Sequence, residues 1–192
     1  MKECFIGLFA VILLLFAVLI FNALRVKLIS RKLTERKIHK TEAEQIEYAE
    51  KLGKIIRCKT VSKKDSYDPV EFEKLCGIVE ALFPLVHKTA EKMTFSEDCW
   101  VYKIKGKDES RNIMLMSHHD VVSATGEWEH PAFCGEIFDG NLWGRGTVDT
   151  KTPLFAELQA IEELLNEGFV PECNVFLGSS HNEEIGGDGI PE

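Results

Sequence analysis

The sequence predicts an α/β domain that follows a single N-terminal transmembrane helix. Two observations support this prediction: an uncharged apolar stretch opens the chain, and helical and strand patterns alternate after residue 40. Alternating helices and strands are typical of a mostly parallel sheet covered by helices, so we expect part of an α/β/α sandwich. The predicted organisation is an anchor over residues 1–24, a basic juxtamembrane segment over 25–40, and a partial α/β/α domain over 41–192.

The first stretch, from Cys4 to Leu24, contains 21 residues without a charge. A helix of that length spans about 30 Å of hydrocarbon. A secretory signal peptide is the alternative, but the charge of Lys2 is offset by Glu3, and no convincing cleavage site precedes the basic segment. We therefore favour a retained, single-pass anchor.

The segment after the apolar stretch is strongly basic. Residues 1–40 carry eight Lys and Arg and two Glu, a charge of +6. Because the net charge of the whole chain is −8, residues 41–192 carry a charge of −14. The positive-inside rule favours the cytoplasmic side for this flank, with an extracytoplasmic location left open, and anionic lipid is an expected contact. The acidic remainder would repel phosphates, which argues against a nucleic-acid partner.

Apolar residues at helical spacing predict three helices after the basic segment. They cover residues 41–57, 69–83 and 152–167. Asp68-Pro69 is a start signal for the second helix, Pro84 is expected to end it, and Gly168 fits the end of the third.

Short apolar runs predict three strands, over residues 99–104, 112–116 and 172–179, and residues 128–139 are expected to form a loop. The six cysteines are widely spread and form no C-x-x-C pair. Buried free thiols are therefore expected, rather than a disulfide framework or a cysteine zinc site.

Three short motifs place metal-ligand side chains beside small residues near predicted strand ends. They are Ser117–Val122, Gly144–Asp149 and His181–Gly187. Taken alone, each has an ordinary alternative: a solvated strand end, a carboxylate that complements a helix dipole, or an acidic surface loop. Together, His, Asp and Glu from three such positions fit a hydrolytic zinc site better than a structural one, which would favour cysteines.

These motifs resemble the zinc-dependent family of aminoacylase, acetylornithine deacetylase, succinyl-diaminopimelate desuccinylase, glutamate carboxypeptidase and Gly-X carboxypeptidase. The similarity extends over roughly residues 45–192, in family order. It rests on His118-x-Asp120, Trp128–Phe133, Asp139–Gly146, Asp149-x-Lys151 and Glu183-Glu184-x-Gly186-Gly187.

The resemblance implies a role for each site residue in a centre of two Zn²⁺ ions. His118 would bind one zinc, Glu184 the other, and Asp149 would bridge both. Asp120 would orient His118, and Glu183 would be the general base. The resemblance also implies a cis peptide bond after Asp149.

The chain also departs from the family pattern. Thr150 and Asn182 stand where many members have other residues, commonly aspartate. The remaining histidines match no ligand position and are expected to be ordinary loop or surface residues: His39, His87, His119, His130 and His181.

A further acidic ligand and a late histidine of the family would lie beyond Glu192, so we expect a fragment comprising the N-terminal half of the catalytic domain. The expected function is a membrane-anchored hydrolase of an amide or peptide bond next to a free carboxylate, acting on a peptide or an N-acyl amino acid. A missing C-terminal half or a homodimer would complete the protein. The alternative is an inactive remnant that only binds metal or a partner.

Overall fold

The computed structural model describes residues 2–33, 40–64, 66–187 and 189. The chain divides into two compact units, Met1–Thr41 and Glu42–Glu192, and each is described by itself.

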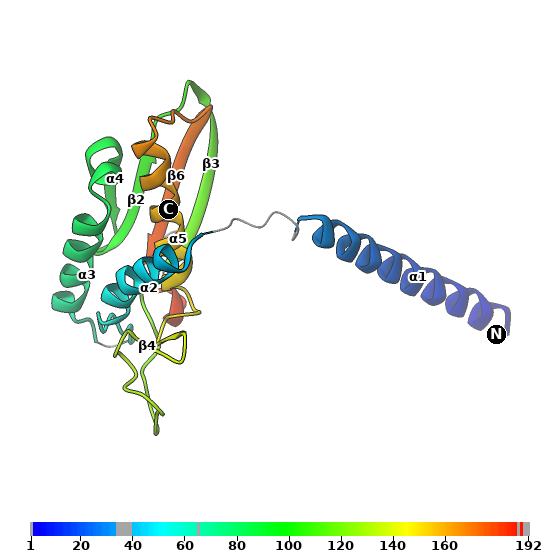
Figure 1. Cartoon of the computed structure of the whole chain (residues 1–192). Coiled ribbons are helices and arrows are strands. Elements are labelled where there is room, and N and C mark those ends of the chain that lie inside the picture. The colour runs from blue at the N-terminus through cyan, green and yellow to red at the C-terminus, as the bar shows by residue number, and fades with distance from the viewer. Residues whose placement is uncertain (1, 34–39, 65, 188, 190–192) are drawn as a thin grey trace. The chain divides into compact units, whose positions relative to one another are not determined.

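The first unit contains one long helix, α1 (Lys2–Leu33) (Figure 1). Its window Phe9–Val26 is long and apolar enough to cross a membrane, and its side chains are exposed. A signal sequence near an N-terminus has the same length and composition. The helix continues beyond the predicted anchor boundary at Leu24 into the basic segment, because Lys and Arg are themselves good helix formers.

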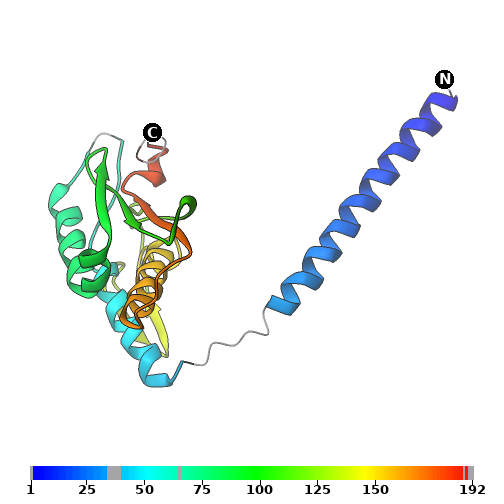
Figure 2. The same cartoon turned by 90° about the horizontal axis from the view of Figure 1, so that it is seen from above.

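The second unit is built on a four-stranded sheet in the order β1-β2-β6-β3 (Figures 1 and 2). The strands are β1 (Glu91–Phe95), β2 (Cys99–Ile104), β3 (Asp108–His118) and β6 (Cys173–Ser180). Only β3 and β6 run parallel, whereas β1 with β2 and β2 with β6 run antiparallel.

The described sheet is therefore mixed, and the expectation of a mostly parallel sheet is wrong for this part of the chain. The reason at one edge is a tight hairpin between β1 and β2, in which Ser96 and Glu97 have φ of 40° and 44°. A short hairpin can join only antiparallel strands, whereas a parallel pair needs a long crossover.

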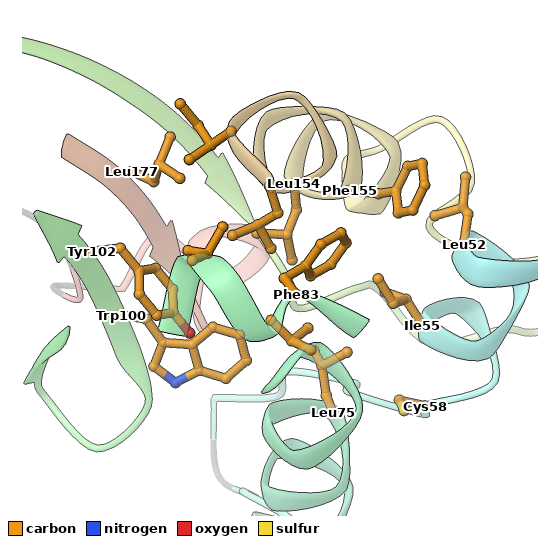
Figure 3. Packing of buried hydrophobic residues seen from close by; sticks show 14 of the residues in the cluster. Leu52, Ile55, Cys58, Leu75, Phe83, Trp100, Tyr102, Leu154, Phe155 and Leu177 are labelled. Atoms are coloured by element: carbon orange, nitrogen blue, oxygen red, sulfur yellow. The ribbon is translucent and has the colours of Figure 1, made fainter. Parts of the chain in front are cut away.

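Four helices cover one face of this sheet. They are α2 (Glu42–Ile56), α3 (Pro69–Leu82), α4 (Pro84–Thr89) and α5 (Lys151–Asn166). Their apolar side chains meet Trp100, Tyr102 and Leu177 of the sheet in a single buried cluster (Figure 3). Trp100 and Tyr102 both face the helices because alternate side chains of a strand share one face.

Local signals explain where several elements begin. The carboxylate of Asp68 accepts a hydrogen bond from the Val70 amide and caps α3, as its position before Pro69 predicted. Pro84 follows the end of α3 and also begins α4. The missing N–H of proline is tolerated in the first turn of a helix.

The segment expected as a loop contains a strand at its end. β4 (Glu136–Phe138) pairs with β5 (Asn141–Trp143) in a separate two-stranded hairpin. Asp139 and Gly140 at its turn have φ of 49° and 76°. Asp-Gly suits this left-handed turn conformation, which requires positive φ at both positions.

Candidate metal centre

The parallel pairing of β3 and β6 brings two of the predicted motifs to the same edge of the sheet. His118 at the end of β3 is in register with Ser180 at the end of β6. Parallel strands present their carboxyl ends together, and ligands of open α/β sheets collect there. Asp149 reaches this edge from the turn before α5, which begins at Lys151.

Three of the predicted site residues converge at this edge. One ligand atom from each of His118, Asp149 and Glu184 lies within 4.8 Å of the others. An imidazole and two carboxylates form a donor set that suits zinc. The structure thus brings the three sequence-predicted metal ligands together, although 66 positions separate the first from the last.

The ring of His118 is held in one orientation. Its Nδ1 atom lies 3.1 Å from the Asp120 carbonyl oxygen and 3.2 Å from Asp120 Oδ1. On the other side of the ring, Nε2 lies 3.1 Å from Oδ1 of Asp149. Nδ1 is therefore engaged by Asp120, while Nε2 faces the carboxylates of the site.

Asp120 is fully buried and connects three segments. Its Oδ2 accepts hydrogen bonds from Ser62 Oγ at 2.5 Å and from the Glu184 amide at 3.1 Å. Its Oδ1 accepts one from the Glu183 amide at 3.2 Å. One carboxylate thus fixes the His118 ring and the backbone of the Glu-Glu segment.

The electrostatics of the site favour a cation. Burial would lower the pKa of His118, but the hydrogen bond and charge of Asp120 outweigh it and raise the pKa to about 9. Burial would raise the pKa of Asp120, but hydrogen bonds from His118 and Ser62 lower it overall. Burial raises the pKa of Glu184, and the carboxylates of Asp149 and Asp120 add to the rise. The carboxylates of the site therefore repel one another, and a metal ion would neutralise their negative charge.

Glu183 lies beside the ligand cluster. It opens a short 3₁₀ turn, Glu183–Ile185, which ends at Gly186 with φ of 64°. The Glu183 carboxylate is exposed, and its Oε2 lies 3.6 Å from His118 Nε2. It is therefore free to meet a water or a substrate atom at the same edge.

Asp149 has an exposed side chain, and the peptide bond between Asp149 and Thr150 is cis, as the family resemblance implied.

Two residues that support the site have no role in the sequence prediction. Ser62 comes from a segment 58 positions before Asp120, and no local pattern signals that contact. Lys151 is fully buried, and its Nζ donates to the carbonyls of Ile55 and Cys58 at 3.2 and 2.7 Å. Burial lowers the pKa of Lys151 to about 8. This lysine joins the start of α5 to the end of α2. In the sequence, only its position in the motif Asp149-x-Lys151 indicated that it belongs to the site.

Two histidines expected to be ordinary loop or surface residues lie in loops but are buried. The ring of His119 stacks on Trp100 at 4.1 Å, and its Nδ1 lies 2.8 Å from Ser179 Oγ. His181 is buried with Nδ1 3.1 Å from Cys99 Sγ. The prediction of a loop position holds for both, but neither lies on the surface, because both pack against β2, a contact that is distant in sequence.

The other three histidines agree better with that prediction or fall outside it. His130 is half-buried in the loop before β4, where it stacks on Phe138, and His87 is half-buried on α4. His39 lies outside the described residues.

Comparison with known proteins points to one family. The model of "Peptidase family M20/M25/M40" matches residues 114–192. The chain is 38% identical over 156 residues to a probable carboxypeptidase S-like 2 of Dictyostelium discoideum. It is 34% identical over 157 residues to the human N-fatty-acyl-amino acid synthase/hydrolase PM20D1. These alignments cover 77% and 78% of this chain.

Solved structures show the same fold. Human carnosine dipeptidase 1 has a TM-score of 0.64 at 18% identity, over 78% of this chain and 34% of that one. A metallo-carboxypeptidase from Sulfolobus solfataricus has a TM-score of 0.61 at 23% identity, over 73% and 32%. The chain spans 30% and 31% of the lengths of the two curated relatives above.

Proposed function

Because the chain belongs to peptidase family M20/M25/M40, we propose that its site serves the zinc-dependent hydrolysis of an amide or peptide bond next to a free carboxylate. The observation that carries the proposal is the convergence of His118, Asp149 and Glu184 within 4.8 Å at the carboxyl edge of β3 and β6.

His118, Asp149 and Glu184 would hold the metal, with Asp149 shared between two ions. Zinc in such a centre polarises a carbonyl and lowers the pKa of a bound water. The fit rests on the donor set and on the orientation of the imidazole, whose Nε2 faces the carboxylates while Nδ1 is held by Asp120.

The remaining residues have distinct tasks. Asp120 keeps the ring of His118 in place and fixes the amides of Glu183 and Glu184. Glu183 would act as the general base, taking a proton from the attacking water and delivering it to the leaving nitrogen. Its exposed carboxylate next to the ligand cluster supports this role.

A cavity beside His118 supports a substrate with an apolar group. This cavity, of about 550 Å³, is lined by Met116, Pro153 and the backbone of Gly186 and Gly187, together with polar groups of the site. Such a lining accepts an apolar group. We therefore propose a peptide with an apolar residue or an N-acyl amino acid as the substrate, and relatives with carboxypeptidase and N-fatty-acyl-amino acid hydrolase names agree with this class.

We further propose that α1 anchors the protein in a membrane. Its exposed apolar window, Phe9–Val26, supports the anchor, and the basic residues that follow favour contact with anionic lipid and a cytoplasmic catalytic unit. Protease protection in sealed vesicles tests the orientation. Digestion of the second unit without detergent is expected, and full protection would contradict a cytoplasmic location.

The proposed function is tested with the full chain purified in a mild detergent. Calorimetry with zinc should show binding, and hydrolysis assays on dipeptides and N-acyl amino acids should show turnover when the chain is combined with the C-terminal half that the family resemblance implies. The Glu183→Gln variant should keep zinc and lose turnover, whereas Glu73→Gln, an exposed change on α3, should retain both. Zinc binding without turnover would support the alternative of a protein that only binds metal. An affinity weaker than about micromolar would contradict the site itself.

A further inference from the structure

We propose that Thr150 is a positioning residue whose hydroxyl fixes His118 relative to Asp149. The hydroxyl makes two hydrogen bonds to the backbone of His118. It accepts from the His118 amide at 3.1 Å and donates to the His118 carbonyl at 3.0 Å. Both bonds bridge 32 positions of sequence.

The backbone of His118 needs such a partner because of its place in the sheet. The next amide, that of His119, donates to Ser180 on β6 at 2.9 Å. In a parallel ladder, successive residues direct their backbone groups to opposite sides. The N–H and C=O of His118 therefore point away from β6, toward the edge of β3 that has no neighbouring strand among the described residues. The Thr150 hydroxyl occupies that edge and satisfies both groups.

The position of Thr150 gives this contact a consequence for the site. Thr150 directly follows Asp149, so a single residue links the backbones of two proposed metal ligands. The side chains of the two ligands also meet directly, because His118 Nε2 lies 3.1 Å from Asp149 Oδ1. Loss of the hydroxyl would remove this link to the backbone of His118 and leave the side-chain contact between His118 and Asp149 without it.

The chemistry of the side chain is specific. A hydroxyl donates one hydrogen bond and accepts others at the same time, so it can satisfy an amide and a carbonyl of one residue. Valine has nearly the same shape and can do neither. Serine keeps the hydroxyl and loses only a methyl group. Thr150 is also one of the positions at which this chain departs from the family pattern.

The test compares three variants of the full chain in detergent: Thr150→Val, Thr150→Ser and Thr152→Val. Thr152 is the matched control, because its hydroxyl donates to the carbonyl of Thr147 and not to a proposed ligand. The first measurement is amide hydrogen exchange of His118 by NMR without metal. Thr150→Val should speed this exchange at least about tenfold, as expected when a hydrogen bond is lost. The other two variants should match the wild type.

The second measurement is zinc affinity by calorimetry, and its interpretation rests on the proposed function. Residues that support ligands typically change metal affinity by about 10–100-fold. Thr150→Val should therefore lose at least about tenfold, Thr150→Ser should restore most of the affinity, and Thr152→Val, which also loses one hydrogen bond, should keep the wild-type affinity. A wild-type chain that does not bind zinc would refute the proposed function, while the exchange data would still test the hydrogen bonds between Thr150 and His118. Unchanged exchange and unchanged affinity in Thr150→Val would overturn the inference, as would an equal loss in Thr152→Val.

Discussion

Nε2 of His118 lies 3.1 Å from Oδ1 of Asp149, although 31 positions of sequence separate the two residues. The contact exists because β3 ends at His118 and the chain returns to the same edge just before α5. Two strong ligand atoms at hydrogen-bond distance, with Glu184 close to both, form a site in which a cation would replace a shared proton.

Removal of the Asp120 charge should weaken metal binding. Asp120→Asn keeps the shape of the side chain but loses the carboxylate. That carboxylate holds Nδ1 of His118 and accepts hydrogen bonds from the amides of Glu183 and Glu184. Zinc affinity should fall about 10–100-fold, measured by calorimetry. The control is Asp139→Asn, at an exposed turn where positive φ suits asparagine. Equal affinities for Asp120→Asn and the wild type would contradict this role.

Zinc binding should release a proton at neutral pH. In the metal-free protein the pKa of His118 is raised to about 9, so the imidazole is protonated at pH 7 and must lose its proton to bind a metal. The apparent affinity should therefore rise about tenfold per pH unit between pH 7 and pH 9 and then level off. Calorimetry in buffers of different ionisation enthalpy measures the released proton. A constant affinity and no release over this range would refute the prediction.

Lys151 should contribute a rise in the stability of the second unit with pH above about pH 8, measured as the difference in slope between the wild type and Lys151→Met. Burial lowers the pKa of Lys151 to about 8 in the folded state, below its ordinary value of 10.5. Between these values the unfolded chain binds more protons than the folded chain, so deprotonation favours folding by up to about 1.4 kcal/mol per pH unit. Urea unfolding followed by tryptophan fluorescence at pH 8, 9 and 10 measures the slope. Lys151→Met should abolish this contribution, and a variant with the wild-type slope would contradict it.

The core should be sensitive to truncation at Leu158. This residue of α5 is fully buried within the cluster that joins the helices to the sheet. Leu158→Ala should lower the free energy of unfolding by about 2–5 kcal/mol, because it leaves a cavity. Val70→Ala, at an exposed position of α3, should change it by less than about 0.5 kcal/mol. Similar values for the two variants in urea unfolding would show that the buried cluster does not stabilise the unit.

Strong local signals made much of the fold predictable. The predicted helix over residues 69–83 agrees with α3, because Asp68 and Pro69 define its start and its apolar spacing is regular. The strand over 99–104 agrees with β2. β1 was missed because its hairpin turns at Ser96 and Glu97, which lack the glycine or asparagine that usually reveals positive φ.

The ligands of the site were predictable because they lie in short motifs next to strand ends. The residues that support the ligands were less predictable, because their roles depend on contacts that only the folded chain creates. Ser62 reaches Asp120 across 58 positions, and His119 turns inward to stack on Trp100. A local pattern records which side chains have suitable chemistry, but the partner of each side chain is set by the packing of distant elements.

The most direct test of the site is to locate zinc in crystals of the full chain grown with the metal, using anomalous diffraction at the zinc absorption edge. The account predicts a peak at about 2.0–2.1 Å from Nε2 of His118, within bonding distance of Asp149 or Glu184. Zinc peaks only at other positions, with His118 Nε2 still hydrogen-bonded to Asp149, would contradict it.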